Sequence, residues 1–227
     1  MKNHSIQIAG KTCTIYESEM SEYMLVQPID GHDLKVLSNE VQTIQSLTGK
    51  PFTLVAFEVM DWQSELTPWS APAAFGEIPF GDGAEVTLSF IIEQLLPQLE
   101  QLQLFDKHKM QCLLGGYSLA GLFALWAGYQ TTIFEGIAAA SPSVWYQGWI
   151  KYAESHQPKA SSVYLSLGDK ENKTKNPLMA QVADCIRKQH DLLETHGIAT
   201  LLEWNSGNHF KDSDIRTAKG FAWLINR

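Results

Sequence analysis

The sequence has no cluster of lysine or arginine residues. Its 227 residues include 17 Lys and Arg against 25 Asp and Glu, which gives a net charge of −8. A nucleic-acid-binding surface needs a concentrated basic patch, so we expect no nucleic-acid partner. The sequence also lacks a His-Glu-x-x-His motif and any clustered set of His and Asp residues, so we expect no metal site.

Cysteine is scarce, and long apolar runs are missing. The three cysteines, Cys13, Cys112 and Cys185, are far apart and odd in number, which excludes a disulfide framework and a Cys-based metal site. Such usage is typical of reduced thiols in a cytoplasmic protein. The N-terminus has no apolar signal core, and no stretch reaches transmembrane length. We therefore expect a cytoplasmic protein with no membrane partner.

Segments with strand and helix patterns alternate along the chain. Apolar positions at three- and four-residue spacing predict helices over 33–47, 83–104 (with a possible kink at Pro97), 177–196 and 209–225. Apolar runs predict strands over 5–16, 23–28, 52–57, 110–114, 134–140, 162–167 and 199–204. This alternation requires crossover connections, hence an α/β fold with a mostly parallel central sheet and helices on both faces. With no linker or repeat, we expect residues 1–227 to form one domain.

Ser118 lies between an apolar strand and a helix-forming segment. Gly116 precedes it by two residues, and Ala120 and Gly121 follow. Small residues at these positions let strand and helix approach closely, so the turn lifts the hydroxyl clear of the backbone. The pattern departs from Gly-x-Ser-x-Gly only at Ala120, which is still small. It predicts a nucleophile elbow with Ser118 as the nucleophile; an ordinary glycine-rich turn is the alternative.

A serine nucleophile needs a base and an acid, which in such sheets follow it in the order acid, then histidine. His209 is the histidine that directly follows a predicted strand after a candidate acid, so it is the expected base. The acid should follow strand 162–167. Glu171 is our first choice because it leaves room for the chain to turn back, and Asp169 is the alternative.

An oxyanion hole requires two backbone N–H groups aimed at the developing negative charge. One should belong to Leu119, directly after the nucleophile. We expect the other in the loop after strand 52–57, at Val59 or Met60. The long irregular stretch 58–82 that begins there has the length of a functional loop, although its tryptophans could equally cover the core.

Four segments resemble the putative serine esterase family of the α/β-hydrolase superfamily, which includes enterochelin-esterase-like and S-formylglutathione-hydrolase-like enzymes. They are Gly-Tyr-Ser-Leu-Ala-Gly-Leu-Phe-Ala-Leu (116–125), Ala-Ser-Pro-Ser-Val-Trp-Tyr (140–146), Glu-Leu-Thr-Pro-Trp (65–69) and Gly-Asn-His-Phe (207–210). The resemblance covers about residues 52–225. It implies an α/β-hydrolase fold without a separate lid domain, and a triad of Ser118, His209 and Glu171 or Asp169.

The resemblance also implies where the substrate lies. Trp145 and the 58–82 loop, with Trp62 and Trp69, would border it, and we expect Tyr117, beside the nucleophile, to bind substrate as well. The arginines that siderophore esterases tend to carry before the Thr-Pro loop are missing, and Asp61 and Trp62 stand there instead. An acidic chain without these arginines is poorly suited to a highly anionic siderophore.

Together these patterns predict a serine esterase that hydrolyses a small-molecule ester through an acyl-enzyme and needs no cofactor. Two alternatives remain open. The same triad could pass the acyl group to an alcohol, as an acyltransferase does. The chain could also be a non-catalytic relative that binds a ligand through its tryptophan-rich loop.

Overall fold

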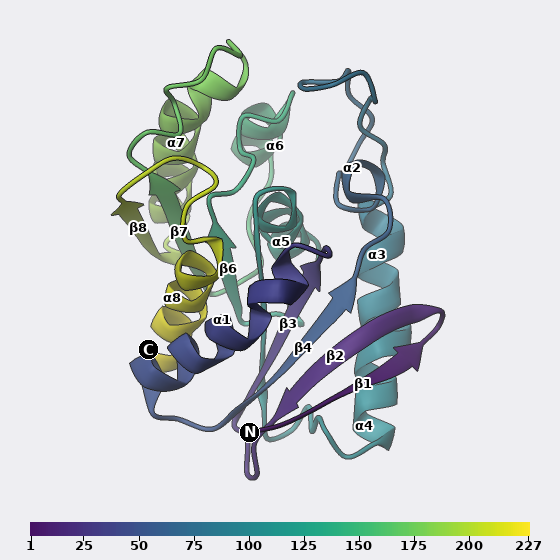
Figure 1. Cartoon of the computed structure of the whole chain (residues 1–227). Coiled ribbons are helices and arrows are strands. Elements are labelled where there is room, and N and C mark those ends of the chain that lie inside the picture. The colour runs from purple at the N-terminus through teal and green to yellow at the C-terminus, as the bar shows by residue number, and fades with distance from the viewer.

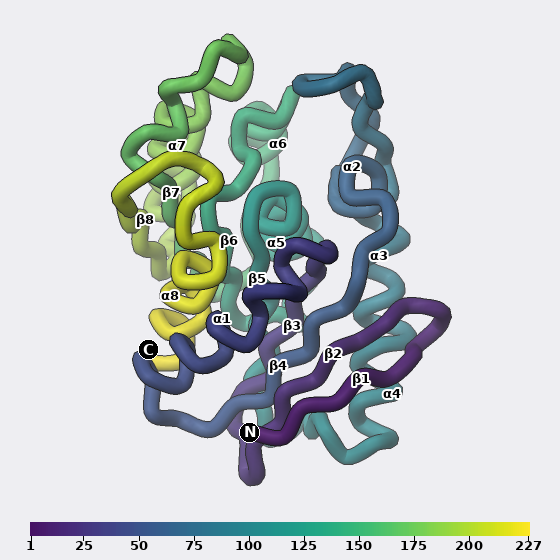
Figure 2. The backbone as a smooth tube through the Cα atoms, in the orientation of Figure 1, coloured from purple at the N-terminus to yellow at the C-terminus, as the bar shows by residue number.

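A computed structural model describes all residues, 1–227. Its centre is one eight-stranded sheet in the order β1-β2-β4-β3-β5-β6-β7-β8 (Figure 1). The strands are β1 (Lys2–Ile8), β2 (Lys11–Glu17), β3 (Tyr23–Ile29), β4 (Phe52–Glu58), β5 (Gln111–Tyr117), β6 (Gly136–Ala140), β7 (Ser162–Gly168) and β8 (Ala199–Asn205). Figure 2 shows the β1–β2 hairpin at one edge of this sheet and β8 at the other.

The sheet is mostly parallel, as the alternation of strands and helices predicts. Strands β3 to β8 pair in parallel, whereas β1 pairs antiparallel with β2, and β2 with β4. The single strand expected over 5–16 is therefore wrong. The chain reverses at Ala9 and Gly10, whose φ angles of 48° and 82° form a tight turn between two strands.

Helices cover both faces of the sheet, as expected. Helices α1 (Asp33–Thr48) and α8 (Ser213–Asn226) lie together on one face. The other face carries α3 (Ala84–Phe90), α4 (Leu96–Gln101), α5 (Leu119–Gln130), α6 (Trp149–Ser155) and α7 (Val182–Thr195). Strand β3 shows why two cores form: Leu25 and Ile29 pack toward α1 and α8, while Met24 and Val26 join the opposite cluster. No separate lid domain is present.

Two predicted helices differ from their observed form. The helix expected over 83–104 is α3 and α4 joined by a π-helical turn, η1 (Ile91–Leu95). This wide turn directly precedes Pro97, which cannot donate the usual backbone hydrogen bond. The helix expected from His209 begins only at Ser213, after Asp212 adopts a left-handed φ of 56°. His209 therefore lies in a loop, and its backbone is free of helical constraint.

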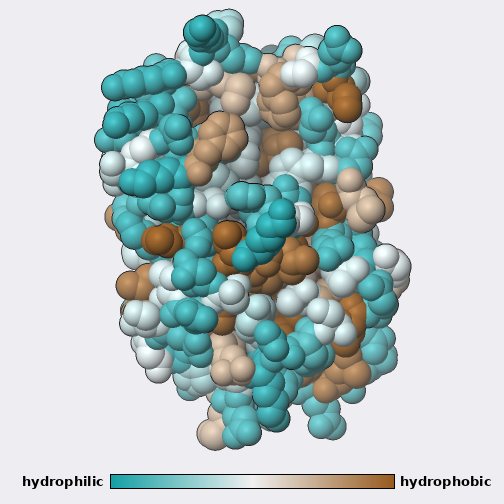
Figure 3. All heavy atoms as spheres, in the orientation of Figure 1, coloured by the Kyte–Doolittle hydropathy of each residue, from teal (hydrophilic) through white to brown (hydrophobic).

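The loops after the parallel strands gather at one end of the molecule. In Figure 1 this is the upper part of the molecule, where the segments following β4, β7 and β8 lie. The segment after β4 contains the short helix α2 (Trp62–Glu65) and is otherwise irregular, and a 3₁₀ turn, η2 (Met179–Gln181), precedes α7. The face seen in Figure 3 is hydrophilic over much of its area, with hydrophobic residues gathered near its middle. None of the helices has both the length and the hydropathy needed to cross a bilayer.

Candidate active site

Ser118 occupies a sharp turn between β5 and α5. Its φ and ψ angles of 59° and −118° are strained for a residue with a side chain. A Cβ atom at Gly116 would lie 2.5 Å from the Cβ of Ala120, so the strand can approach the helix only with glycine there. A Cβ at Gly121 would lie 3.0 Å from the Gly116 carbonyl oxygen. The departure at Ala120 fits, because glycine at position 116 leaves space for its methyl group.

Three predicted residues from separate loops form one hydrogen-bonded chain. Nε2 of His209 lies 3.0 Å from Oγ of Ser118, and Nδ1 lies 2.7 Å from Oε2 of Glu171. A carboxylate can only accept, so Nδ1 carries the proton and Nε2 is free to accept the serine proton. Ser118 follows β5, Glu171 follows β7 and His209 follows β8, so all three lie at the carboxyl edge of the sheet, with β6 between β5 and β7.

The carboxyl group of Glu171 is buried and surrounded by donors. Oε1 accepts hydrogen bonds from the Ser141 hydroxyl at 2.8 Å, the Gly168 N–H at 2.7 Å and Nη1 of Arg216 at 2.9 Å. Burial raises the pKa of Glu171, but its interactions with His209, Gly168 and Ser141 outweigh burial and lower the pKa below its ordinary value. Glu171 is therefore ionised beside the imidazole at neutral pH.

Asp169, the alternative acid, has a different partner. Its Oδ1 accepts a hydrogen bond from the N–H of Gly207 at 2.8 Å, in the loop that carries His209. The Asp169 N–H in turn donates to the Asn205 carbonyl at 2.8 Å. Asp169 thus ties the loop after β7 to the loop after β8, while the carboxylate that contacts the imidazole is that of Glu171.

The structure corrects the second predicted oxyanion donor. The N–H of Val59 already donates to the Ile29 carbonyl at 2.9 Å, and the N–H of Met60 donates to Oε1 of Glu65 at 2.9 Å. The error lies in the strand order, because β3 rather than β4 pairs with β5. On the β4 side of the sheet, the loop next to Ser118 is therefore the one after β3, and in it the N–H of Gly31 has no acceptor within the chain.

Leu119, the other predicted donor, is the first residue of α5. At this position a backbone N–H has no intrahelical acceptor, so it is available at the start of the helix beside Ser118. The positive end of the helix dipole lies at the same place and favours negative charge there. The geometry at Leu119 is thus suited to an anion.

The aromatic side chains predicted to border a substrate are largely engaged within the protein. Trp69 donates its indole N–H to the Gln147 carbonyl at 2.8 Å, and Trp145 is buried with its ring 6.2 Å from that of Phe80. Trp62 is half-buried against the core. These three contacts are those of core aromatic residues, and a role in substrate binding stays a prediction.

Tyr117 is buried beside His209, with the two ring centroids 5.2 Å apart. Its hydroxyl donates to the His209 carbonyl oxygen at 2.8 Å and accepts from Nη1 of Arg216 at 3.1 Å. Burial, followed by the negative charge of Glu171, raises the pKa of Tyr117 to about 12. Tyr117 therefore contacts the backbone of the histidine as a neutral phenol.

Sequence reasoning missed three polar residues around the site. Ser143 places its Oγ 3.4 Å from that of Ser118, and Ser141 and Arg216 contact Glu171. Ser141 and Ser143 belong to the segment singled out by family resemblance, but their contacts depend on the tertiary fold. Arg216 had one available signal: it is a charged residue on the otherwise apolar buried face of the last helix.

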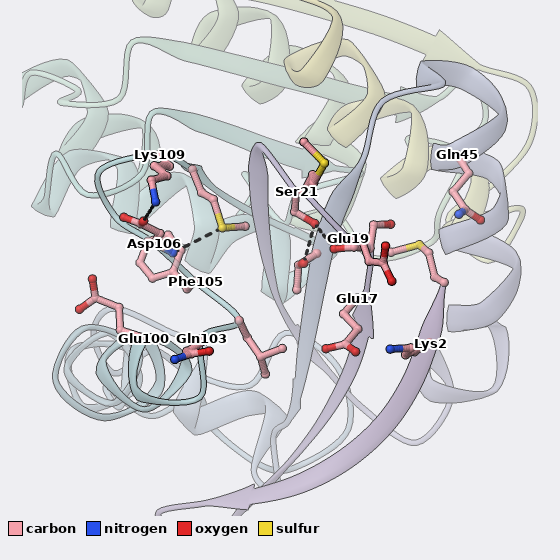
Figure 4. A pocket seen from close by; sticks show the side chains of 16 residues that line it. Lys2, Glu17, Glu19, Ser21, Gln45, Glu100, Gln103, Phe105, Asp106 and Lys109 are labelled. Atoms are coloured by element: carbon pink, nitrogen blue, oxygen red, sulfur yellow. Dashed lines mark hydrogen bonds and ion pairs between the residues drawn. The ribbon is translucent and has the colours of Figure 1, made fainter.

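A hollow of about 1120 Å³ lies at the opposite edge of the sheet, near the amino ends of the parallel strands (Figure 4). Its labelled side chains are mostly charged or polar, and Lys109 forms an ion pair with Asp106 at 2.9 Å. None of the residues of the Ser118 chain lines it. This hollow therefore forms no part of the candidate active site.

One group of side chains has ligand atoms close enough to share a metal ion. His190, Asp191 and Glu194 place one such atom each within 4.8 Å of the others on α7. The two carboxylates are exposed, and none of the three contacts Ser118, His209 or Glu171 in the hydrogen-bonded chain. They have no part in the chemistry of the candidate site.

Comparisons with known proteins show that the fold is shared with other proteins. The chain is 23% identical over 225 residues to the uncharacterized protein YbbA of Bacillus subtilis (strain 168), covering 93% of this chain and 89% of that protein. The crystal structure of an IroE-like serine hydrolase from Shewanella oneidensis superposes with a TM-score of 0.80 at 16% identity, covering 99% of this chain and 80% of the other. The siderophore hydrolase EstA from Aspergillus nidulans gives a TM-score of 0.69 at 18% identity, with 99% and 94% covered.

The family match identifies the protein at the level of its enzyme class. Residues 14–209, which include Ser118, Glu171 and His209, match the family described as Putative esterase. The IroE-like serine hydrolase shares the fold of this chain over 99% of this chain's length. The chain therefore belongs to the Putative esterase family of ester-hydrolysing enzymes.

Proposed function

We propose that the protein is a serine esterase that hydrolyses a small-molecule carboxylic ester through an acyl-enzyme formed on Ser118. The observation that carries this proposal is the continuous hydrogen-bonded chain from Ser118 through His209 to Glu171, with the serine on a strained elbow. A serine hydroxyl is a poor nucleophile unless a positioned base removes its proton. The hydrogen-bonded chain supplies that base, His209, together with the carboxylate of Glu171, which fixes the tautomer of the imidazole.

In the first half of the reaction, Ser118 attacks the ester carbonyl while His209 takes its proton. The resulting imidazolium is stabilised by the ionised Glu171 at 2.7 Å. His209 then gives the proton to the leaving alcohol, and the acyl group stays on Ser118. In the second half, His209 activates a water molecule that releases the acid and restores the serine.

The tetrahedral oxyanion is held by two backbone N–H groups, those of Leu119 and Gly31. Leu119 supplies an unpaired N–H at the start of α5, and Gly31 supplies one from the loop after β3. Strands β3 and β5 are parallel neighbours, so their following loops share one edge of the sheet. Donors fixed in place before reaction stabilise developing charge without reorganisation.

The substrate is a neutral or weakly charged ester rather than a polyanion. EstA is named a siderophore hydrolase, and a siderophore ester would be the corresponding candidate here. Yet the segment before the Thr-Pro loop carries Asp61 and Trp62 where siderophore esterases tend to have arginines, and the chain has a net charge of −8. Repulsion would oppose a highly anionic ligand.

Since strands from β1 to β8 share one sheet, we propose that residues 1–227 act as one domain.

A fluorophosphonate probe tests the nucleophile directly, because only an activated serine reacts with it. Ser143 provides a matched control, since its hydroxyl lies 3.4 Å from that of Ser118 and is buried beside it. We expect mass spectrometry to find the label on Ser118, with labelling kept in Ser143→Ala and lost in His209→Ala.

Turnover of p-nitrophenyl acetate provides the second measurement. Ser118→Ala is expected to lose activity by a factor on the order of 10⁶, the loss typical for removal of a triad nucleophile. Wild-type turnover by folded Ser118→Ala, or labelling of Ser143 in place of Ser118, would overturn the proposal.

A further inference from the structure

Arg216 carries a fully buried charge that ester hydrolysis by Ser118, His209 and Glu171 does not itself require. Its side chain is about 1% exposed, and it projects from α8 toward the loops after β7 and β8. A buried charge is costly unless it is paired and hydrogen-bonded. Its Nε–H has no acceptor, so the arginine is not fully satisfied even here. A residue kept only for stability would more simply be apolar at this position.

One side of the guanidinium contacts the acid. Nη1 lies 2.9 Å from Oε1 of Glu171 and 3.1 Å from Oγ of Ser141, which also donates to Oε1. Oε2 of the same carboxylate bonds His209. The arginine therefore fixes one oxygen of Glu171 and leaves the other directed at the imidazole.

The other side of the guanidinium contacts the loop that carries the base. Nη2 donates to the carbonyl oxygens of Ser206 at 3.3 Å and Asn208 at 3.1 Å, on either side of Gly207. Nη1 also donates to the Tyr117 hydroxyl, which in turn donates to the His209 carbonyl. Two routes, one direct and one through Tyr117, thus join Arg216 to the backbone around His209.

Gly168 shows how closely these groups are packed. A Cβ atom there would lie 3.0 Å from both Nη atoms of Arg216 and would collide with the Gly207 carbonyl oxygen. The loop after β7 and the loop after β8 therefore meet at the guanidinium with no room for a side chain between them. The guanidinium touches both the acid and the segment holding the base.

We propose that Arg216 is a positioning residue that sets Glu171 and His209 in register for proton transfer. The inference rests on the proposed function of Ser118, His209 and Glu171. Arg216 does not reach Ser118 in the hydrogen-bonded chain, so it acts through the acid and the His209 loop. A misplacement of about 1 Å in a catalytic group costs roughly 10²-fold in rate. Loss of Arg216 should therefore lower kcat and leave KM unchanged.

The experiment compares Arg216→Met, Arg216→Lys and Thr217→Val with the wild type on p-nitrophenyl acetate. Thr217 is the matched control: it is the next residue of α8, it is buried, and its hydroxyl bonds only the Ser213 carbonyl of its own helix. We expect kcat about 10²-fold lower in Arg216→Met, with KM within twofold, and an intermediate kcat in Arg216→Lys, which keeps the charge but not the fork. Thr217→Val should retain the wild-type kcat.

Chemical rescue separates positioning from stability. Guanidinium added to Arg216→Ala can refill the vacated site and should raise kcat in a saturable way, whereas Thr217→Val should not respond. Circular dichroism at each guanidinium concentration keeps the comparison to folded protein. Wild-type kcat in folded Arg216→Met, an equal loss in Thr217→Val, or no rescue of folded Arg216→Ala would each overturn the inference.

Ser118→Ala is assayed in parallel to keep the two proposals distinct. If Ser118→Ala retains turnover, the proposed nucleophile is wrong whatever the arginine variants do. If Ser118→Ala is inactive while folded Arg216→Met matches the wild type, the proposed function stands and the positioning role of Arg216 fails.

Discussion

Replacing Glu171 by glutamine should disable the base while leaving the site assembled. The three donors around Oε1, from Ser141, Gly168 and Arg216, require an acceptor at that position. The amide oxygen of Glu171→Gln must therefore occupy it, because turning the amide would face its NH₂ group toward donors. The NH₂ group then points at Nδ1 of His209, where the carboxylate oxygen was 2.7 Å away.

This orientation fixes the wrong tautomer of the imidazole. With an amide donating to Nδ1, the ring proton of His209 moves to Nε2, which can then no longer accept the proton of Ser118. The variant also loses the negative charge that stabilises the imidazolium. Replacing a triad acid by its amide with the geometry intact lowers kcat by about 10⁴-fold, or about 5 kcal/mol at about 1.36 kcal/mol per factor of ten.

The assay is kcat on p-nitrophenyl acetate for Glu171→Gln beside Asp169→Asn. Asp169 accepts only the Gly207 N–H, and an amide oxygen accepts equally well, so Asp169→Asn should stay within about threefold of the wild type. Thermal melts by circular dichroism confirm that both variants fold. A folded Glu171→Gln with wild-type kcat, or a larger loss in Asp169→Asn, would refute the reasoning.

Three further predictions concern stability. Burial raises the pKa of Glu40 well above its ordinary value, so folded Glu40 stays protonated where the unfolded chain ionises, and the stability of the wild type falls as pH rises. Glu40→Gln, whose amide can also pair with the unpartnered Oε1 of Gln27, should gain about 1 kcal/mol of unfolding free energy over the wild type per pH unit above pH ~5. Urea unfolding measures this difference, and no gain would contradict the prediction. The lowered pKa of Glu171 acts in the opposite direction: the ionised carboxylate stabilises the folded protein above about pH 4.3, and this stabilisation is lost as pH falls through the folded pKa. The unfolding free energies of wild type and Glu171→Gln should therefore converge in acid. Gly116→Ala should cost about 1–3 kcal/mol of stability by overpacking against Ala120 and should lower kcat, whereas Ala120→Gly should retain activity. Melting curves and ester turnover check both variants. Wild-type stability and kcat in Gly116→Ala would show that the turn at Ser118 can relax.

Much of the site follows from local sequence and chain order. An apolar strand, small residues around Ser118 and a helix-forming segment specify an elbow, because each acts on its immediate neighbours. Parallel strands place their following loops at one edge, so the residues after β7 and β8 could be expected near Ser118. The structure brings Glu171 and His209 to that edge. It also shows why Asp169, two residues away, faces Gly207 instead.

The errors fall where the order of strands in space matters. Val59 and Met60 follow β4, and nothing in the sequence shows that β3 lies between β4 and β5. The sequence pattern therefore does not point to Gly31 in the loop after β3. The pattern over 5–16 likewise predicts one strand where the structure has the hairpin of β1 and β2, because both halves alternate and only the turn at Gly10 divides them.

The sequence by itself determined what depends on neighbours along the chain: the alternation of helices and strands, the sharp turn at Ser118, and the order of the proposed nucleophile, acid and base. Only the tertiary structure decided which distant groups meet. Arg216 lies 45 residues from Glu171 and 99 from Tyr117, yet its guanidinium contacts both. Hydrogen bonds and ion pairs act over about 3 Å, so their partners are set by how α8 packs against the sheet and by no pattern along the chain.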